Sequence, residues 1–597
     1  MCKKWTVAGS CLVAVLLLGV PMTLAAKPQG KQEPMVPLTA DGQQLLAKYA
    51  ALLTELQGEI SKALPPIAAQ QRANFMDTFA AESKAGKYSD ANAKFVTATK
   101  NTAAAAKPIL DTVSSWLGGD KLDPVLVKAT VIAQATPRGL AAFAQQGAPQ
   151  AGLIDRLLAD PDLMKEMLVA GGAHDGNYGR TMEIYSAIQK ASPGAKEGVL
   201  QRLALAVALD QVSAQGTKID PLERYEDFEQ AYRKGELDEV FPKLTTWELR
   251  MVVDEPYTDQ EIQWVRQMIK NYRPDLMTID YRWRYTEISP DEVEYTHFNG
   301  DIVPGTMAQK IIASGGVCGP RAWFGRLAAR AFGIPVWGEQ QPGHAAWTHW
   351  TPDGWIICQG SNWDDCHWYG QPGMDFYLES EARQFPDQYT KVLRAQWLGD
   401  IFGQTRFNGN HLGVAGFWPA LGLVEERNTV VDNHPKVAQR IHPNAFWGPV
   451  NIPAADRNIT VAADGTITIP AVATTTPANT TAKVRFMKSD LGGMQLHYAR
   501  LGSKPESIVY TLDAPAAGKY LLTARVVTVA IDQELLLTVD DATTPVTIAV
   551  PYTVGMWGKT QPVEVSLAKG KNVFTLARGG KDIRGVTIKD FTLTPVR

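Results

Sequence analysis

The sequence predicts a multidomain protein with an all-α N-terminal region, an α+β core and an all-β C-terminal sandwich. Three patterns support this. Apolar residues recur at helical spacing over residues 37–215, a helix–strand–hairpin pattern occupies residues 315–365, and short alternating strands fill residues 458–597. At 597 residues the chain is too long for one hydrophobic core, so several structural units are expected.

Residues 1–26 are expected to be a signal peptide. Lys3 and Lys4 precede an apolar run over residues 7–20. Small residues ending at Ala26 supply a cleavage site. The apolar run is too short and too interrupted for a retained membrane anchor. We therefore expect a secreted or periplasmic protein without a membrane partner after cleavage.

The charge pattern argues against nucleic acid as a partner. The formal net charge is -3, and no long basic run interrupts the chain. Proteins that bind nucleic acid through its phosphates need a basic patch or stripe.

The helical region over residues 37–215 is expected to form several antiparallel helices. Its apolar stripe is clearest in the residues Leu45, Tyr49, Leu52, Leu56 and Ile60. Such a stripe indicates a helix packed on a core rather than a cofactor site. Residues 220–455 are expected to form the α+β core with flanking helices and loops.

A cysteine and a histidine mark the centre of the core. The segment Gly315-Gly316-Val317-Cys318-Gly319 opens an amphipathic run that ends at Gly333. The segment Gly343-His344-Ala345-Ala346-Trp347 then begins a hairpin strand. A helix N-terminus favours the thiolate form of a cysteine, and a histidine on a nearby strand can accept and return a proton. The glycines are expected to allow a tight turn and close approach of a substrate backbone.

Over residues 300–370 this order of motifs resembles the transglutaminase-like superfamily of papain-like cysteine enzymes. The resemblance implies that Cys318 is the nucleophile, that His344 is the general base and acid, and that an acidic residue orients the imidazole. It also implies hydrolysis of a peptide or amide, or acyl transfer to an amine, without a cofactor. The substrate would be a protein, a peptide or a cell-wall amide.

The third catalytic residue is left open by the sequence. The position where the family has aspartate holds Gln359, and one alanine is added after His344. A turn at residues 352–354 would place His344 across from Ser361 or Trp363, with Gln359 as a diagonal neighbour. Asn362 and Asp364 are the alternatives if a bulge or loop turns them inward.

Neither a metal nor a settled disulfide is predicted. The spacing of His344, His349 and His367 across a hairpin does not match a zinc site. After signal cleavage the cysteines are Cys318, Cys358 and Cys366. Either Cys358 and Cys366 form a disulfide, or all the thiols are reduced.

Tryptophans are unusually dense around the histidine. They are Trp337, Trp347, Trp350, Trp355, Trp363 and Trp368. Such residues either build the core or line a groove for an extended chain or a sugar.

The C-terminal strands over residues 458–597 resemble jelly-roll carbohydrate-binding modules. That resemblance implies sugar contacts through exposed aromatic side chains, for which Tyr498 and Trp557 are the candidates. A sandwich that only supports the core is an equal alternative. The alternative to a cysteine enzyme is therefore an inactive transglutaminase-like scaffold that binds polysaccharide or glycoprotein through the sandwich.

Overall fold

The structure is a computed structural model. It describes residues 36–84, 99–210, 219–254, 256–277, 285–341, 343–352, 354–358, 367–368, 371–406, 415–433, 448–500, 506–579 and 583–596. Residues 36–597 belong to one compact unit. The expected signal peptide lies outside the described residues. Within them, no helix has the length and hydropathy needed to cross a bilayer.

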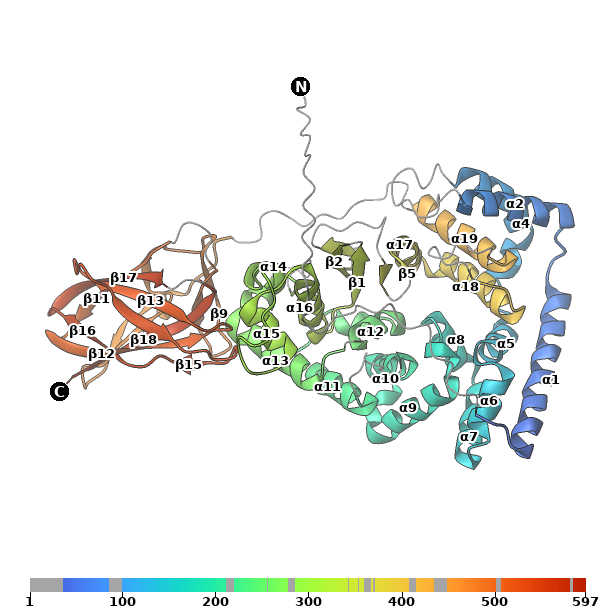
Figure 1. Cartoon of the computed structure of the whole chain (residues 1–597), viewed down its shortest axis with the longest axis horizontal. Helices are drawn as coiled ribbons and strands as arrows, with labels where there is room; N and C mark the ends of the chain where they lie inside the picture. The colour runs from blue at the N-terminus through green and yellow to red at the C-terminus, as the bar shows by residue number, and fades with distance from the viewer. Residues whose placement is uncertain are drawn as a thin grey trace, which may run out of the picture. The chain divides into compact units, whose positions relative to one another are not determined.

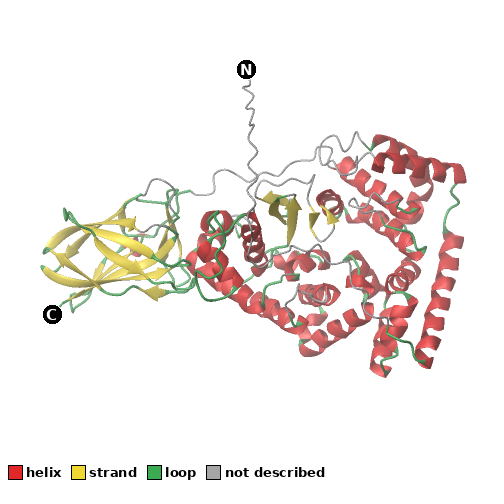
Figure 2. Cartoon of the chain, viewed as in Figure 1, coloured by secondary structure: helices red, strands yellow, loops and turns green. Residues whose placement is uncertain are grey.

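The N-terminal region is helical, as predicted (Figures 1 and 2). Its α-helices are α1 (Ala40–Ala63), α2 (Ala69–Lys84), α4 (Lys100–Gly118), α5 (Asp123–Ala135), α6 (Pro137–Ala144), α7 (Ala148–Ala159), α8 (Pro161–Val169), α9 (Tyr178–Ala191) and α10 (Gly198–Asp210). Thr39 caps α1 by accepting a hydrogen bond from the Gly42 amide. The apolar stripe of α1 is buried at Tyr49, Leu56 and Ile60, which confirms its assignment to the core.

Two later helices, α18 (Pro386–Ile401) and α19 (Phe417–Asn433), pack against this N-terminal region. The Arg394 guanidinium of α18 donates to both carboxylate oxygens of Asp123 on α5, at 2.7 and 2.8 Å. Arg394 and Asp123 are both buried, so the ion pair joins chain segments that the sequence assigned to different units. The contact therefore links the helical region to a helix of the expected core, and the division near residue 215 stays a prediction.

The core begins with a series of helices, some of whose first turns are fixed by capping boxes. They are α11 (Pro221–Arg233), α12 (Thr246–Val253), α13 (Asp259–Tyr272), α14 (Ile288–Glu292), α15 (Met307–Ser314) and α16 (Cys318–Ala331). In α12, α13 and α15 a threonine side chain accepts from the third helical amide while the Glu or Gln there accepts from the threonine amide. These reciprocal bonds define where each helix starts.

A small antiparallel sheet follows α16. It consists of β1 (Val336–Gln341), β2 (His344–His349) and β3 (Ile356–Cys358), in that spatial order. β2 pairs with β3 through Trp347 opposite Cys358 and His349 opposite Ile356. This pairing agrees with the register expected from a turn at residues 352–354, over the strand residues that the structure describes. The short strands β4 (His367–Trp368) and β5 (Gln371–Pro372) and the helix α17 (Gly373–Ala382) come next.

The C-terminal domain consists of two antiparallel sheets, which confirms the predicted all-β region (Figure 2). One sheet contains β6 (Thr460–Val461), β7 (Ile467–Pro470), β9 (Val484–Lys488), β10 (Met494–Tyr498), β12 (Gly518–Val527), β15 (Gly558–Lys559), β16 (Val563–Leu567) and β18 (Val586–Pro595). The other contains β8 (Thr474–Thr476), β11 (Ile508–Ala514), β13 (Gln533–Val539), β14 (Val546–Val550) and β17 (Gly570–Gly579). Residues of β11 and β17 alternate between buried and less buried positions, so one face of each sheet forms the common core.

One part of the first sheet is buried on both faces. Gln495 and His497 point away from the sandwich core, yet both are fully buried. The Gln495 amide donates to the Asn271 carbonyl at 2.8 Å, and the His497 ring lies 3.0 Å from a Glu292 oxygen. The sandwich therefore meets the core through a polar, buried surface.

Candidate functional site

Cys318 is the first residue of α16, as predicted, and its side chain is partly exposed. Val317 is the N-cap residue and supplies no side-chain cap. The first backbone amides of α16 consequently point toward the space beside the thiol. This arrangement can stabilise negative charge on the sulfur or on an adjacent oxyanion.

The glycines before Cys318 serve the fold rather than a substrate. A Cβ atom on Gly315 would lie 2.6 Å from the Glu294 carbonyl oxygen, and one on Gly316 would lie 2.4 Å from Pro320 Cβ. Gly315 also has a positive φ of 88°. The expectation of close substrate approach is therefore wrong for these two positions. Only Gly319 among the three faces open space.

His344 is the first residue of β2 and is half-buried. α16 packs against both β1 and β2, and β2 runs antiparallel to β1.

A close contact joins the helix α16 to the strand β2. A Cβ atom on Gly325 of α16 would lie 2.8 Å from the Trp347 ring of β2. This contact shows that α16 and β2 pack closely, and the pairing of Cys318 with His344 stays a prediction.

Arg321 is a charged neighbour of the thiol that the motif analysis missed. It lies one turn after Cys318, and its guanidinium lies 5.6 Å from the centre of the Tyr295 ring. Burial lowers the pKa of Arg321 from its ordinary value, whereas the nearby Cys318 opposes that shift. Tyr295 is 63% exposed, so this pair forms an accessible rim beside Cys318. Arg321 could have been found from the sequence, because residues three apart on a helix, such as Cys318 and Arg321, lie on the same face.

The third catalytic residue and the disulfide stay predictions. Gln359, Asn362 and Asp364 lie outside the described residues, as does Cys366. Cys318 is recorded as a free thiol.

The tryptophans divide between the two expected roles. Trp347 is fully buried, and Trp337 and Trp355 are nearly so. Trp350, which directly follows β2, is half-buried. Core packing therefore accounts for most of the described tryptophans, but not for Trp350.

The two aromatic residues predicted to contact sugar differ. Tyr498 is completely buried in the sandwich core, and its hydroxyl group donates to the Glu506 carbonyl. It does not present a ring to solvent, because Tyr498 shares the inward face of β10 with Met494 and Leu496. The alternation of this strand was the signal that could have placed it in the core.

Trp557 lies just before β15 and is half-buried. Its indole N–H has no hydrogen-bond partner in the described part of the chain. Tyr552 in the same loop is also half-buried. The loop contacts α13 through the carbonyl oxygens of Val554 and Gly555, which accept from Trp264 and Asn271 at 2.8 and 3.1 Å.

The C-terminal region resembles jelly-roll carbohydrate-binding modules of known structure. The C-terminal CBM6 of LamC, a marine laminarinase from Zobellia galactanivorans, is 20% identical, with 22% of this chain and 98% of the module covered and a TM-score of 0.19. The module CBM6cm-2 of Cellvibrio mixtus lichenase 5A, in complex with cellotriose, is also 20% identical, with 22% and 97% covered and a TM-score of 0.18.

Longer neighbours are matched over a small part of their length. The isomalto-dextranase of Arthrobacter globiformis T6, complexed with panose, is 18% identical, with 22% of this chain and 23% of the enzyme covered and a TM-score of 0.18. No family model and no curated protein matches the chain. The resemblance of the core to transglutaminase-like enzymes consequently stays a prediction.

Proposed function

We propose that this chain binds polysaccharide and that its C-terminal sandwich supplies one contact surface through Trp557. The observation that carries the proposal is the half-buried Trp557 ring, which leaves part of the indole accessible just before β15. A pyranose ring can pack its C–H face on an indole ring. The indole N–H is buried and is not part of the proposed contact.

Retention of the full chain on insoluble polysaccharides tests this proposal. We expect binding to at least one of cellulose, β-1,3-glucan, mannan and chitin, and a loss of retention in Trp557→Ala. Leu521→Ala is a matched control, because Leu521 is an exposed apolar residue of the same domain. Equal retention of Trp557→Ala and the wild type would contradict the role of Trp557, and no retention on any of the polysaccharides would contradict the proposed function.

A second candidate function is supported by the position of Cys318 at the start of α16 and by the close packing of α16 on β2, the strand that begins at His344. Here Cys318 would attack an amide carbonyl while His344 takes the thiol proton. The imidazolium would then give that proton to the leaving amine, and water or another amine would cleave the thioester. The export predicted from the signal sequence would place both functions outside the cytoplasm.

Alkylation of Cys318 with iodoacetamide tests the pair. If His344 activates the thiol, the rate at about pH 5 should stay within a few-fold of the rate at about pH 8, and His344→Ala should remove that behaviour. Cys318→Ala identifies the labelled residue, and His174→Ala is a control for loss of an unrelated histidine. If the alkylation rate of the wild type rises steeply with pH, as it does for free cysteine, the second candidate function is contradicted.

A further inference from the structure

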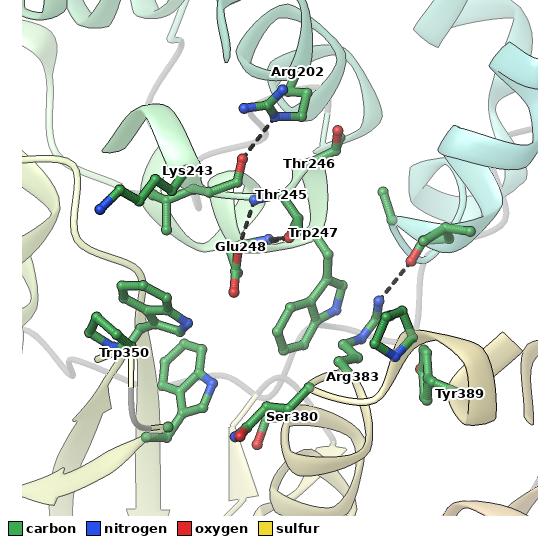
Figure 3. A pocket seen from close by; sticks show the side chains of 18 of the residues that line it. Arg202, Lys243, Thr245, Thr246, Trp247, Glu248, Trp350, Ser380, Arg383 and Tyr389 are labelled. Atoms are coloured by element: carbon green, nitrogen blue, oxygen red, sulfur yellow. Dashed lines mark hydrogen bonds between the residues drawn. The ribbon is translucent and has the colours of Figure 1, made fainter. Parts of the chain in front are cut away.

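A separate pocket of about 600 Å³ lies beyond the far end of β2. Its walls come from the β2–β3 turn, from α12 and the segment before it, and from α17 and α18 (Figure 3). This volume lies within the range of pockets that hold small ligands.

The pocket is distinct from the Cys318–His344 end of the core. Trp350 lines it, whereas His344 starts the strand that Trp350 follows. Six residues of extended strand separate the two by about 20 Å. Activity at the thiol and binding in the pocket can therefore be tested separately.

Aromatic rings supply much of the pocket wall. Trp247 and Trp350 are half-buried, and Trp355 closes the wall behind them. Trp247 is held in place because Trp355 and Phe376 pack on it, with ring centres 6.3 and 6.0 Å away. The Arg383 guanidinium lies 4.3 Å from the centre of the Trp247 ring. These rings form rigid apolar faces.

Most charged groups at the pocket have partners within the protein. Arg383 pairs with Glu379 at 2.7 Å. The Glu166 carboxylate accepts from Thr246 at 2.8 Å and from Gln201 at 3.0 Å. Arg202, which also lines the pocket, donates to backbone carbonyls and is opposite in charge to Glu166.

Two polar groups remain for a ligand. Lys243 lines the pocket, is exposed, and has no carboxylate partner in the described ranges. One oxygen of Glu248 accepts from the Thr245 amide and hydroxyl at 2.7 and 2.9 Å. Figure 3 shows the Glu248 carboxylate pointing into the space between Trp350 and Trp247. Burial raises the pKa of Glu248, while bonds from Thr245 and Trp350 oppose the shift.

We propose that this pocket binds a short stretch of an uncharged saccharide, with Trp350 and Trp247 as ring platforms. Lys243 donates to sugar oxygens, and Glu248 accepts from sugar hydroxyl groups. The carboxylates Glu166 and Glu248 are matched by Arg202 and Lys243, and Arg383 is paired with Glu379, so the pocket has no net charge to attract an ionic ligand. Apolar faces with a donor and an acceptor suit a polyol ring. The inference deepens the proposed polysaccharide binding by adding a site outside the sandwich.

The test is a titration of the full chain by intrinsic tryptophan fluorescence and calorimetry. The probes are cellotriose, laminaritriose, mannotriose and N,N′,N″-triacetylchitotriose, with anionic trigalacturonate and cationic chitosan trimer as charged controls. We expect saturable binding of at least one uncharged probe and weaker binding of both charged ones. Trp350→Ala should weaken the affinity about tenfold or more, and Lys243→Ala about threefold or more.

Matched variants separate this inference from the sandwich proposal. In Trp557→Ala, which removes the sandwich contact, a saturable trisaccharide-binding step that depends on Trp350 should remain, whereas Trp350→Ala should leave the retention through Trp557 in place. Lys243 is exposed, so its variant keeps the test valid if Trp350→Ala does not fold. No saturation by any uncharged probe up to about 10 mM would overturn the inference. Saturation with unchanged affinity in both pocket variants would overturn it as well.

Discussion

At the scale of single residues, Tyr498 shows how a polar aromatic side chain becomes part of a core. Its ring is fully buried, and burial raises the pKa of its hydroxyl group to about 12. Its hydrogen bond to the Glu506 carbonyl satisfies the hydroxyl in an apolar surrounding. The residue is therefore explained by stability rather than by ligand binding.

We predict that Tyr498→Phe lowers the free energy of unfolding by about 1 kcal/mol and does not change retention on polysaccharide. Because the folded-state pKa lies above the ordinary value, Tyr498 also contributes stability that is lost as the pH rises above about 10, and the variant should lack this part of the pH dependence. Urea unfolding at neutral and alkaline pH measures both effects. If Tyr498→Phe had the stability of the wild type but were no longer retained on polysaccharide, Tyr498 would be a sugar-binding residue and the prediction would be contradicted.

At the scale of elements, the contact between α16 and β2 decides how the core is assembled. Trp347 is fully buried and occupies the space that a side chain at position 325 would need. Glycine inside a helix costs about 1 kcal/mol relative to alanine. That cost is offset because the absence of a side chain lets the buried Trp347 ring pack directly on α16.

Two glycine-to-alanine substitutions should change the stability of the protein in opposite directions. Gly325→Ala gains about 1 kcal/mol of helix propensity. It places a methyl group 2.8 Å from the buried Trp347 ring. Overpacking of this kind costs about 1–3 kcal/mol, so we expect net destabilisation. Gly58→Ala in α1 meets no atom within 4 Å and should stabilise the protein. Chemical unfolding of both variants is the measurement, and stabilisation by Gly325→Ala would show that the helix and strand are not in close contact.

At the scale of the whole molecule, buried charges join the sandwich to the core. The Glu292 carboxylate accepts from Arg273 and Tyr272, each at 2.7 Å, and lies 3.0 Å from the His497 ring of β10. Burial alone would raise the pKa of Glu292, but His497, Arg273 and Tyr272 together hold it below its ordinary value. Burial lowers the pKa of His497, so the imidazole is mainly neutral near pH 7.

The lowered pKa values of Glu292 and His497 determine how the folding stability depends on pH. Both folded-state pKa values lie below the ordinary ones, so both groups contribute stability above those ordinary values. This stability is lost as the pH falls, first below about 6.5 for His497 and then below about 4.3 for Glu292. Acid should therefore weaken the contact between sandwich and core.

We predict that Glu292→Gln lowers stability at neutral pH by about 3 kcal/mol or more, because it leaves buried Arg273 with one fewer carboxylate. The variant should also lose less stability than the wild type between about pH 6 and pH 3. Melting temperatures across that range measure both effects. Glu564→Gln, which changes an exposed ion pair on β16, is the control. Parallel acid profiles for wild type and Glu292→Gln would contradict the assignment.

The local elements could be predicted from the amino-acid sequence. Apolar spacing predicted α1, alternation predicted the sandwich strands, and Cys318 was correctly placed at a helix start. These features depend on neighbours a few residues away, whose effect on backbone energy can be read from periodicity and capping residues.

Only the tertiary structure decided which surfaces are covered. Alternation assigns Gln495 and His497 to an outer face, but residues more than two hundred positions away bury them. The Asp123–Arg394 pair and the pocket between Trp247 and Trp350 likewise depend on distant segments. Long-range burial leaves no periodic trace in the local sequence, because the free energy comes from excluding water between elements whose order along the chain does not specify their contact.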